Sequence, residues 1–208
     1  GATFVHAFDD TDVIAGQGTL GLELLEQLPD VDTVVVPVGG GGLLAGLISA
    51  LRGSGSRARI IGVQAAGASS LQPSLSAGTR VELARVDTIA DGLATRSIGA
   101  QPFEIIRSGV DDAVEVSDAE IAESVLLLLE RAKTVGEGAG AVGLAACLAR
   151  RIGAAGAKVA VVISGGNIDT NLLDRIINLG LAHEGRLFRF TTLLQDRPGE
   201  LQRLVTCI

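Results

Sequence analysis

The sequence predicts an α/β fold in which a parallel, twisted sheet carries helices on both of its faces. Apolar runs of strand length alternate along the 208 residues with amphipathic stretches of helix length. Apolar residues make up 47% of the chain and aromatic residues only 2%, so the core must be built from small and aliphatic side chains. Such a core suits close packing of helices on a sheet.

The expected elements follow this alternation along the chain. Helices are expected at residues 13–28, 43–51, 121–133, 139–152 and 172–181, and strands at 33–37, 60–64, 113–116 and 158–163. Ser117 and Glu120 form a capping box that marks the start of the third helix.

Residues 33–51 are apolar over almost the length of a bilayer span. Pro37 and the glycines at 39–42 would leave backbone groups unsatisfied in lipid. We therefore interpret this stretch as a strand, a loop and a helix, and we expect no membrane partner.

The pattern changes after Leu181. The polar connector AHEGR leads into RLFRFTTLLQDRPGELQRLV, whose alternation predicts a half-buried strand, a turn at Pro198-Gly199 and the start of a helix. Phe188 and Phe190 are two of the five phenylalanines, which favours a separate core. We expect residues 1–182 to belong to one domain, and residues 183–208 to be a linker with the truncated start of a second.

Charge and composition exclude several classes of protein. The net charge of −7, with no basic cluster interleaved with aromatics, argues against a nucleic-acid partner. Cys147 and Cys207 form neither a disulfide framework nor a metal-ligand pattern, so a reducing, cytoplasmic setting is expected. His6 and His183 are isolated and predict surface or packing roles. The chain has no methionine and no signal segment, which is typical of an internal piece of a longer chain.

The four consecutive glycines Gly39, Gly40, Gly41 and Gly42 lie where a strand hands over to a helix. Backbone N–H groups at such a helix start can hold a phosphate, and the stretch 33–81 contains arginines but no acidic residue. Leu43 and Leu44 follow instead of the Lys-Ser/Thr pair of a P-loop, and Gln64 stands where a dinucleotide site needs a carboxylate. A compact monophosphate is the ligand predicted, and a purely structural turn is the alternative.

A second glycine loop, Ser164-Gly165-Gly166-Asn167, follows the last buried strand. Open parallel sheets bind ligands at this edge, and Ser164 can form one neutral hydrogen bond there. A helix N-cap with a flexible lead-in is the alternative interpretation.

Five motifs together resemble the threonine dehydratases, which are fold-type II lyases dependent on pyridoxal phosphate (PLP) and are related to serine dehydratases and serine racemase. They are DVIAGQGTLGLEL (12–24), VPVGGGGLLAG (36–46), IADGLA (89–94), GEGAGAVG (136–143) and SGGNID (164–169), in the order and spacing of that family. The resemblance covers about residues 1–182 and implies a tryptophan synthase β-like fold. The tail motif DRPGEL resembles the start of an ACT domain, a small regulatory module that binds amino acids.

The resemblance also implies roles for individual residues. The backbone from Gly39 to Gly42, with Leu43, would hold the PLP phosphate, and the Ser164 hydroxyl would bond the pyridine nitrogen. Gly92 would pass close to the cofactor. Glu137 would lie near the ring, with a favourable place in the first turn of a helix as its alternative.

The reaction implied is the conversion of L-threonine to 2-oxobutanoate and ammonia, and of L-serine to pyruvate. It requires a lysine that forms a Schiff base with PLP. Lys133 and Lys158 are the only lysines, and neither lies at the expected ligand edge, so we expect the catalytic lysine upstream of Gly1 and an inactive fragment.

Three further expectations come with the family. Serine racemase-like relatives bind a divalent cation just after the strand that ends here at Gln64, but QAAGASS offers no carboxylate, so no metal site is expected. A homo-oligomer and an amino-acid effector at the tail are expected. A serine racemase-like enzyme and a non-catalytic amino-acid sensor remain alternatives; a nucleotide-binding module lacks its acidic ribose partner.

Overall fold

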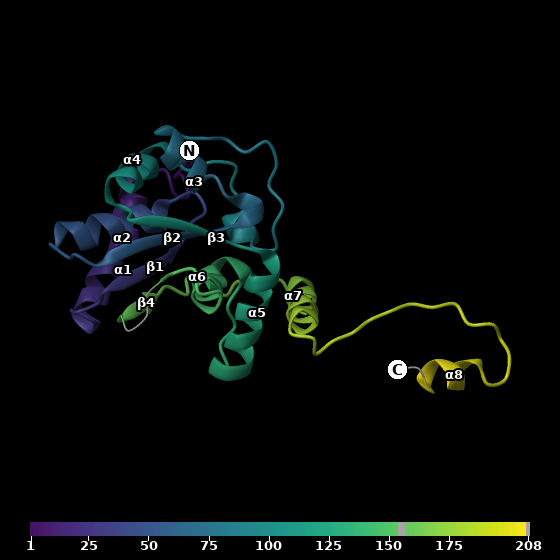
Figure 1. Ribbon diagram of the computed structural model, residues 1–208. Helices are drawn as coiled ribbons and strands as arrows, with labels where there is room; N and C mark the ends of the chain where they lie inside the picture. Colours follow the sequence, from purple (N-terminus) through teal and green to yellow (C-terminus); the bar gives the residue numbers. More distant parts are fainter. Residues whose placement is uncertain (154–156, 207–208) are drawn as a thin grey trace.

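The computed structural model describes residues 1–153 and 157–206 as an α/β body followed by an extended tail (Figure 1). The elements, in chain order, are α1 (Thr11–Gln27), β1 (Thr33–Pro37), α2 (Gly42–Gly53), β2 (Arg59–Ala65), α3 (Leu71–Ala77), α4 (Ala100–Gly109), β3 (Asp112–Val116), α5 (Asp118–Leu127), a π-helix (Leu128–Ala132), α6 (Gly138–Leu148), β4 (Val159–Val161), α7 (Thr170–His183) and α8 (Glu200–Thr206). Short 3₁₀ turns lie at Ala66–Ala68 and Asp91–Leu93.

The four strands form one parallel sheet in the order β3-β2-β1-β4. Val34 of β1 stands opposite Ile60 of β2 on one side and Ala160 of β4 on the other. Every residue of β1 is buried, as expected of a central strand covered on both faces. Since all four strands are parallel, their carboxyl ends meet at one edge.

Helices cover both faces of this sheet, which confirms the predicted fold class (Figure 1). Val34 and Val36 face a core that includes residues of α1, α2 and α4. Val35, which points the opposite way because side chains alternate along a strand, joins the core with α5 and α6. Helix α7 packs on α5 through Ile176.

Helices α1 and α2 approach each other closely because glycines line their crossing. A methyl group on Gly46 of α2 would lie 2.5 Å from the carbonyl oxygen of Ile14 and 2.7 Å from the backbone nitrogen of Gly18. Real Cβ atoms do not come so close to backbone, so the contact requires glycine at position 46.

Most predicted elements are present at nearly the predicted bounds. The strand at 33–37 is confirmed without change, and the stretch 33–51 is indeed a strand, a loop and a helix. The capping box of Ser117 and Glu120 is confirmed, with both reciprocal hydrogen bonds. Among the described residues, no helix combines the length and apolarity that crossing a bilayer requires.

Three predictions of local structure were incomplete. The helix expected at 121–133 changes to a π-helix over its last turn, and the strand expected at 158–163 is shortened to Val159–Val161. Helices α3 and α4 were missed. Helix α4 carries Pro102 near its start. Its cap is the side chain of the distant Asp9, so the residues next to the helix contain no capping signal that would predict its start.

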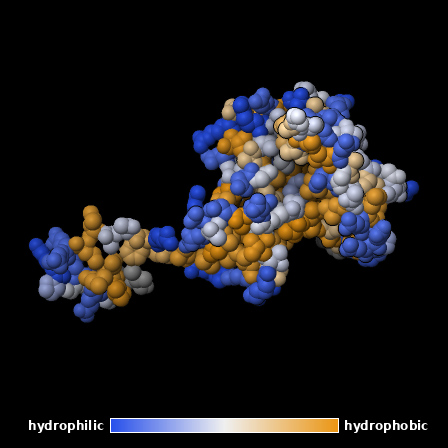
Figure 2. Space-filling model, turned by 180° about the vertical axis from the view of Figure 1, so that it is seen from behind, coloured by the Kyte–Doolittle hydropathy of each residue, from blue (hydrophilic) through white to orange (hydrophobic). Residues whose placement is uncertain are grey.

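The strand predicted in the tail is wrong for the described residues, because residues 187–195 form no strand or helix. A strand needs a neighbouring strand to satisfy its backbone, and no strand of the described sheet lies beside this segment. The helix start after Pro198-Gly199 is confirmed as α8. Apolar side chains lie exposed along the tail, among them Phe188 (82%) and Leu193 (98%) (Figure 2).

We predict that Gly46→Ala lowers the free energy of unfolding by about 1–3 kcal/mol, because the added methyl overpacks the crossing of α1 and α2. Chemical denaturation measures this change. Gly53→Ala in the same helix is the control, since no atom lies within 4 Å of its Cβ position. That change should be neutral or stabilise by up to about 1 kcal/mol. Equal losses in both variants would contradict the close crossing.

Candidate functional site

The carboxyl edge of the sheet brings the two glycine loops together. The first runs from the end of β1 at Pro37 through Gly39–Gly42 into α2, and the second runs from β4 through Ser164 towards α7. Because β1 and β4 are parallel neighbours, these loops leave the sheet side by side.

All eight residues predicted for the site line a single pocket of about 360 Å³ at this edge. They are Gly39, Gly40, Gly41, Gly42, Leu43, Gly92, Glu137 and Ser164. Six further residues line it that the sequence did not single out, namely Ala7, Phe8, Gln17, Pro37, Leu93 and Ala139. Phe8 carried the clearest available signal, since it is one of only five phenylalanines.

The first glycine loop leaves its backbone donors available. Gly41 is the N-cap of α2, has φ of 93° and supplies no side-chain cap. Within the described part of the chain, no backbone acceptor is recorded for the N–H groups of Gly39 to Leu43. Free N–H groups at a helix N-terminus form a cradle for an anion, and a phosphate group fits it.

The electrostatics of this cradle come from the backbone. None of the residues that line the pocket is Lys or Arg. Of the arginines in the stretch 33–81, Arg52 and Arg59 lie at the opposite end of α2 and of β2, where they pair with Asp111 and Asp112. Both side chains therefore lie at the amino edge of the sheet, away from the cradle.

Ser164 lies exposed to the pocket at the start of the second loop. No hydrogen bond of its hydroxyl is recorded among residues 1–153 and 157–206. The residue that caps α7 is Asp169, whose side chain accepts from Asn171 and Leu172. The alternative of Ser164 as the N-cap therefore does not hold, and its hydroxyl can bond a neutral acceptor in the pocket.

The Glu137 carboxyl lies between the second glycine loop and the 3₁₀ turn at Asp91–Leu93. A methyl group on Gly165 would lie 2.2 Å from its Oε1 atom, and one on Gly92 would lie 3.8 Å away. The Glu137 N–H donates to the carbonyl oxygen of Gly165 at 3.0 Å. The Glu137 side chain does not cap α6. Its carboxylate occupies space beside residue 165 that is available because this residue is a glycine.

The same surroundings change the acidity of Glu137. Burial raises the pKa of its carboxyl, and the negative charge of Asp91 raises it further. The pocket therefore favours the neutral form of Glu137, beside the neutral hydroxyl of Ser164.

Both lysines lie outside this pocket. The Lys158 ammonium pairs with Asp30 just before β4, at the amino edge of the sheet. The Lys133 ammonium donates to the carbonyl oxygen of Glu130 at 2.8 Å, at the end of the π-helix.

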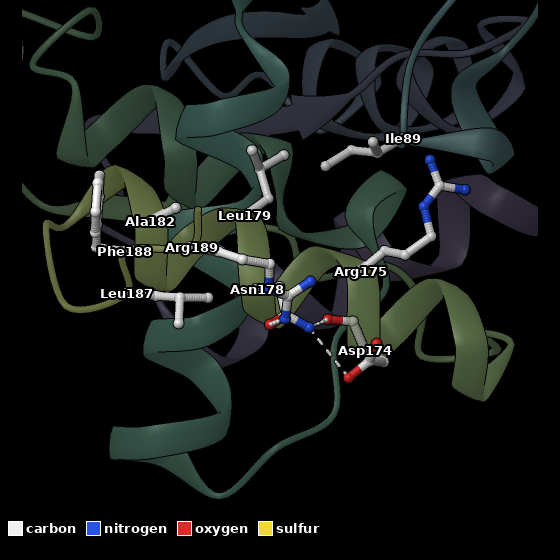
Figure 3. A pocket seen from close by; sticks show the side chains of 9 residues that line it. All are labelled: Ile89, Asp174, Arg175, Asn178, Leu179, Ala182, Leu187, Phe188 and Arg189. Atoms are coloured by element: carbon white, nitrogen blue, oxygen red, sulfur yellow. Dashed lines mark hydrogen bonds between the residues drawn. The ribbon is translucent and has the colours of Figure 1, made fainter. Parts of the chain in front are cut away.

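A larger hollow of about 670 Å³ lies elsewhere, between α7, Ile89 and the start of the tail (Figure 3). Asp174, Arg175 and Asn178 from α7 line it, with Phe188 from the tail. It contains none of the predicted site residues and neither glycine loop. The smaller pocket, where the predicted residues meet, is the candidate site.

Comparisons with known proteins agree with this geometry. The family model described as "Pyridoxal-phosphate dependent enzyme" matches residues 1–165. The chain is 50% identical to an L-threonine ammonia-lyase of Thermotoga maritima over 99% of its own length and 51% of that protein. It is 48% identical to an L-threonine ammonia-lyase of Geobacter sulfurreducens, again over 99% and 51%.

Solved structures give the same result. The processed form of threonine deaminase isoform 2 from Solanum lycopersicum matches with a TM-score of 0.80 and 35% identity, over 86% of this chain and 53% of that one. Maize serine racemase matches with a TM-score of 0.79 and 36% identity, over 84% and 55%. The chain thus spans about half the length of the relatives it matches.

We predict that Gly41→Val weakens the binding of PLP by about tenfold or more, since a branched side chain is strained at a φ of 93° and would contact Ile106 and Pro102 at 2.9 and 3.0 Å. Absorbance after dialysis measures the cofactor that remains. Gly78→Val is the matched control, because Gly78 also has a positive φ but lies outside the pocket. Equal loss of cofactor in the two variants would count against the cradle.

We predict that Glu137→Gln raises the thermal stability of the protein at neutral pH. The raised pKa means that the folded state favours the protonated carboxyl of Glu137. The stability that this preference contributes is fully present below the ordinary pKa of Glu, about 4.3, and is lost as the pH rises through the folded-state pKa. The neutral amide avoids that loss, so its advantage should shrink as the pH falls towards 4. Thermal unfolding from pH 4 to 8 tests this, and a difference independent of pH would contradict it.

Proposed function

This chain belongs to the pyridoxal-phosphate dependent enzyme family, and we propose that the whole protein is a threonine ammonia-lyase. It would convert L-threonine to 2-oxobutanoate and ammonia, and L-serine to pyruvate and ammonia. The names of the relatives that cover nearly all of this chain support threonine as the substrate. The observation that carries the proposal is the meeting of an uncapped glycine cradle and a neutral hydroxyl, Ser164, in one pocket.

The cradle would hold the cofactor by its phosphate. The N–H groups of Gly39 to Leu43 lie at the start of α2, where the helix dipole favours a negative group. Gly92, whose carbonyl oxygen lies 3.1 Å from the position of a Cβ on Gly39, has no side chain that would narrow the pocket. This arrangement binds and orients the cofactor without a basic side chain.

The two polar groups would act at the other end of the cofactor. When bound, PLP withdraws electrons from the amino acid and makes its Cα proton acidic. The Ser164 hydroxyl would hold the pyridine nitrogen through a neutral hydrogen bond. Glu137 lines the same pocket, and burial, with the negative charge of Asp91, raises the pKa of its carboxyl.

The catalytic lysine would come from a part of the protein outside this chain. Lys133 and Lys158 both have partners away from the pocket. The relatives are about twice as long as this chain, which leaves room for a second lobe that carries the lysine and the site for the substrate carboxylate.

We also propose that residues 183–208 begin an ACT-like regulatory domain that binds an amino-acid effector. The exposed apolar side chains of Phe188, Leu193, Leu201 and Val205 support this, because such residues need a core of their own. A cytoplasmic homo-oligomer is the form in which we expect the protein to act.

Reduction of the whole protein with borohydride, followed by peptide mapping, tests the proposed function together with an assay of 2-oxobutanoate from threonine. A pyridoxyl-lysine outside this chain, with release of 2-oxobutanoate, would support it. A label on Lys133 or Lys158 would show that the active edge is misplaced. No label and no turnover would favour an amino-acid sensor, and conversion of L-serine to D-serine without an oxo acid would favour a racemase.

We predict that Ser164→Ala lowers kcat by about tenfold to a hundredfold and leaves PLP bound, because the phosphate cradle supplies most of the affinity. Steady-state kinetics and the absorbance of the dialysed protein measure the two effects. Ser164→Thr keeps a hydroxyl and should recover part of the activity. Unchanged turnover in Ser164→Ala would contradict the role assigned to this residue.

A further inference from the structure

The aromatic ring of Phe8 lies directly against the first glycine loop. A methyl group on Gly40 would lie 2.3 to 2.4 Å from three ring carbons of Phe8, and one on Gly42 would lie 3.0 Å from the Phe8 Cβ. The ring therefore occupies the space that a side chain at position 40 would need. Phe8 also lines the pocket beside these glycines.

A tight turn fixes the position of Phe8. The Nδ1 atom of His6 accepts hydrogen bonds from the N–H groups of Phe8 at 3.3 Å and Asp9 at 3.0 Å. The His6 and Phe8 rings meet edge to face, with centroids 4.6 Å apart and planes at 83°.

Asp9, the next residue, caps α4, the helix that packs on the other side of the glycine loop. Its carboxylate accepts from the N–H groups of Ala100 at 2.7 Å and Gln101 at 2.8 Å, so it caps a helix that begins ninety residues further along the chain. The N-cap position of α4 is Gly99, which supplies no side-chain cap of its own.

Helix α4 in turn packs on the glycine loop. Pro102 and Ile106 come within 3.0 and 2.9 Å of the position that a Cβ on Gly41 would take, and Gly99 N–H donates to the carbonyl oxygen of Gly40 at 2.9 Å. The loop thus lies between the Phe8 ring and α4. The dipeptide Phe8-Asp9 supplies the ring on one side and the cap of α4 on the other.

We propose that Phe8 and Asp9 are positioning residues that hold the glycine loop in the geometry that binds the cofactor phosphate, Phe8 directly and Asp9 through α4. Four consecutive glycines have more backbone freedom than any other tetrapeptide, so the cradle needs restraint from outside itself. The inference rests on the proposed binding of PLP to this loop.

The test compares the affinity of the whole protein for PLP with its affinity for pyridoxal, which lacks only the phosphate. Phe8→Ala and Asp9→Ala should each weaken PLP binding by about tenfold and change pyridoxal binding much less. Asp10→Ala is the matched control, because the neighbouring Asp10 carboxylate also caps a helix, but that helix is α1, through the N–H groups of Asp12 and Val13. A fall in the preference for PLP that is equal in Asp9→Ala and Asp10→Ala would overturn the inference.

An exchange of size between Phe8 and Gly40 tests the direct contact. Gly40→Ala alone should weaken PLP binding by about tenfold, since Gly40 has no positive φ and the three atoms nearest to the added methyl all belong to the Phe8 ring. Adding Phe8→Ala should then weaken binding by much less than the tenfold expected of Phe8→Ala alone, because the small side chain also relieves the clash. A double variant that binds PLP as weakly as the product of the two single effects predicts, or more weakly, would overturn the inference.

Failure of the inference is distinguishable from failure of the proposed function. If the unmodified protein does not prefer PLP to pyridoxal, the cradle itself is wrong. If it does prefer PLP and the Phe8 and Asp9 variants keep that preference, the cradle stands and the positioning role is wrong. The conservative Phe8→Leu, which retains an apolar side chain, gives the same comparison if Phe8→Ala does not fold.

Discussion

The parallel pairing of β1 with β4 is the constraint on which the site depends. It sets Val34 opposite Ala160, so the loops that leave these strands emerge at the same edge, although more than a hundred residues separate them. The cradle of Gly39 to Gly42 and the hydroxyl of Ser164 meet only because of this pairing. A slip of the register would move the two loops apart along the edge and would also exchange the faces of the sheet that each strand buries.

Close approach at glycines is the second device that shapes this protein. With only five phenylalanines and no tyrosine or tryptophan, the fold gains contact by bringing backbones together. Gly46 allows α2 to touch α1, Gly165 makes room for the Glu137 carboxyl, and Gly40 makes room for the Phe8 ring. Glycine therefore allows close helix packing in the body and shapes the pocket at the site. The two uses differ in the neighbour that fills the space left by the missing side chain.

The pocket recognises charge through backbone dipoles. Its walls carry no Lys or Arg, and Arg52 and Arg59 pair with aspartates at the opposite edge of the sheet. Burial raises the pKa of the Glu137 carboxyl, and the negative charge of Asp91 raises it further. An anion at the helix start and a neutral ring at the second loop are what this distribution accommodates, and both belong to pyridoxal phosphate.

The sequence by itself determined the alternation of strands and helices and the start of α5 at Ser117, because these signals are local, and its resemblance to a known family pointed to eight of the fourteen residues that line the candidate pocket. Tertiary structure alone decided the rest. The cap of α4 comes from Asp9, and the Phe8 ring meets Gly40 across more than thirty residues. The pKa of Glu137 is raised by burial and by Asp91, and the tail lacks the neighbouring strand that its alternation requires. Each of these depends on partners that the chain brings together only when it folds, so no local pattern of residues encodes them.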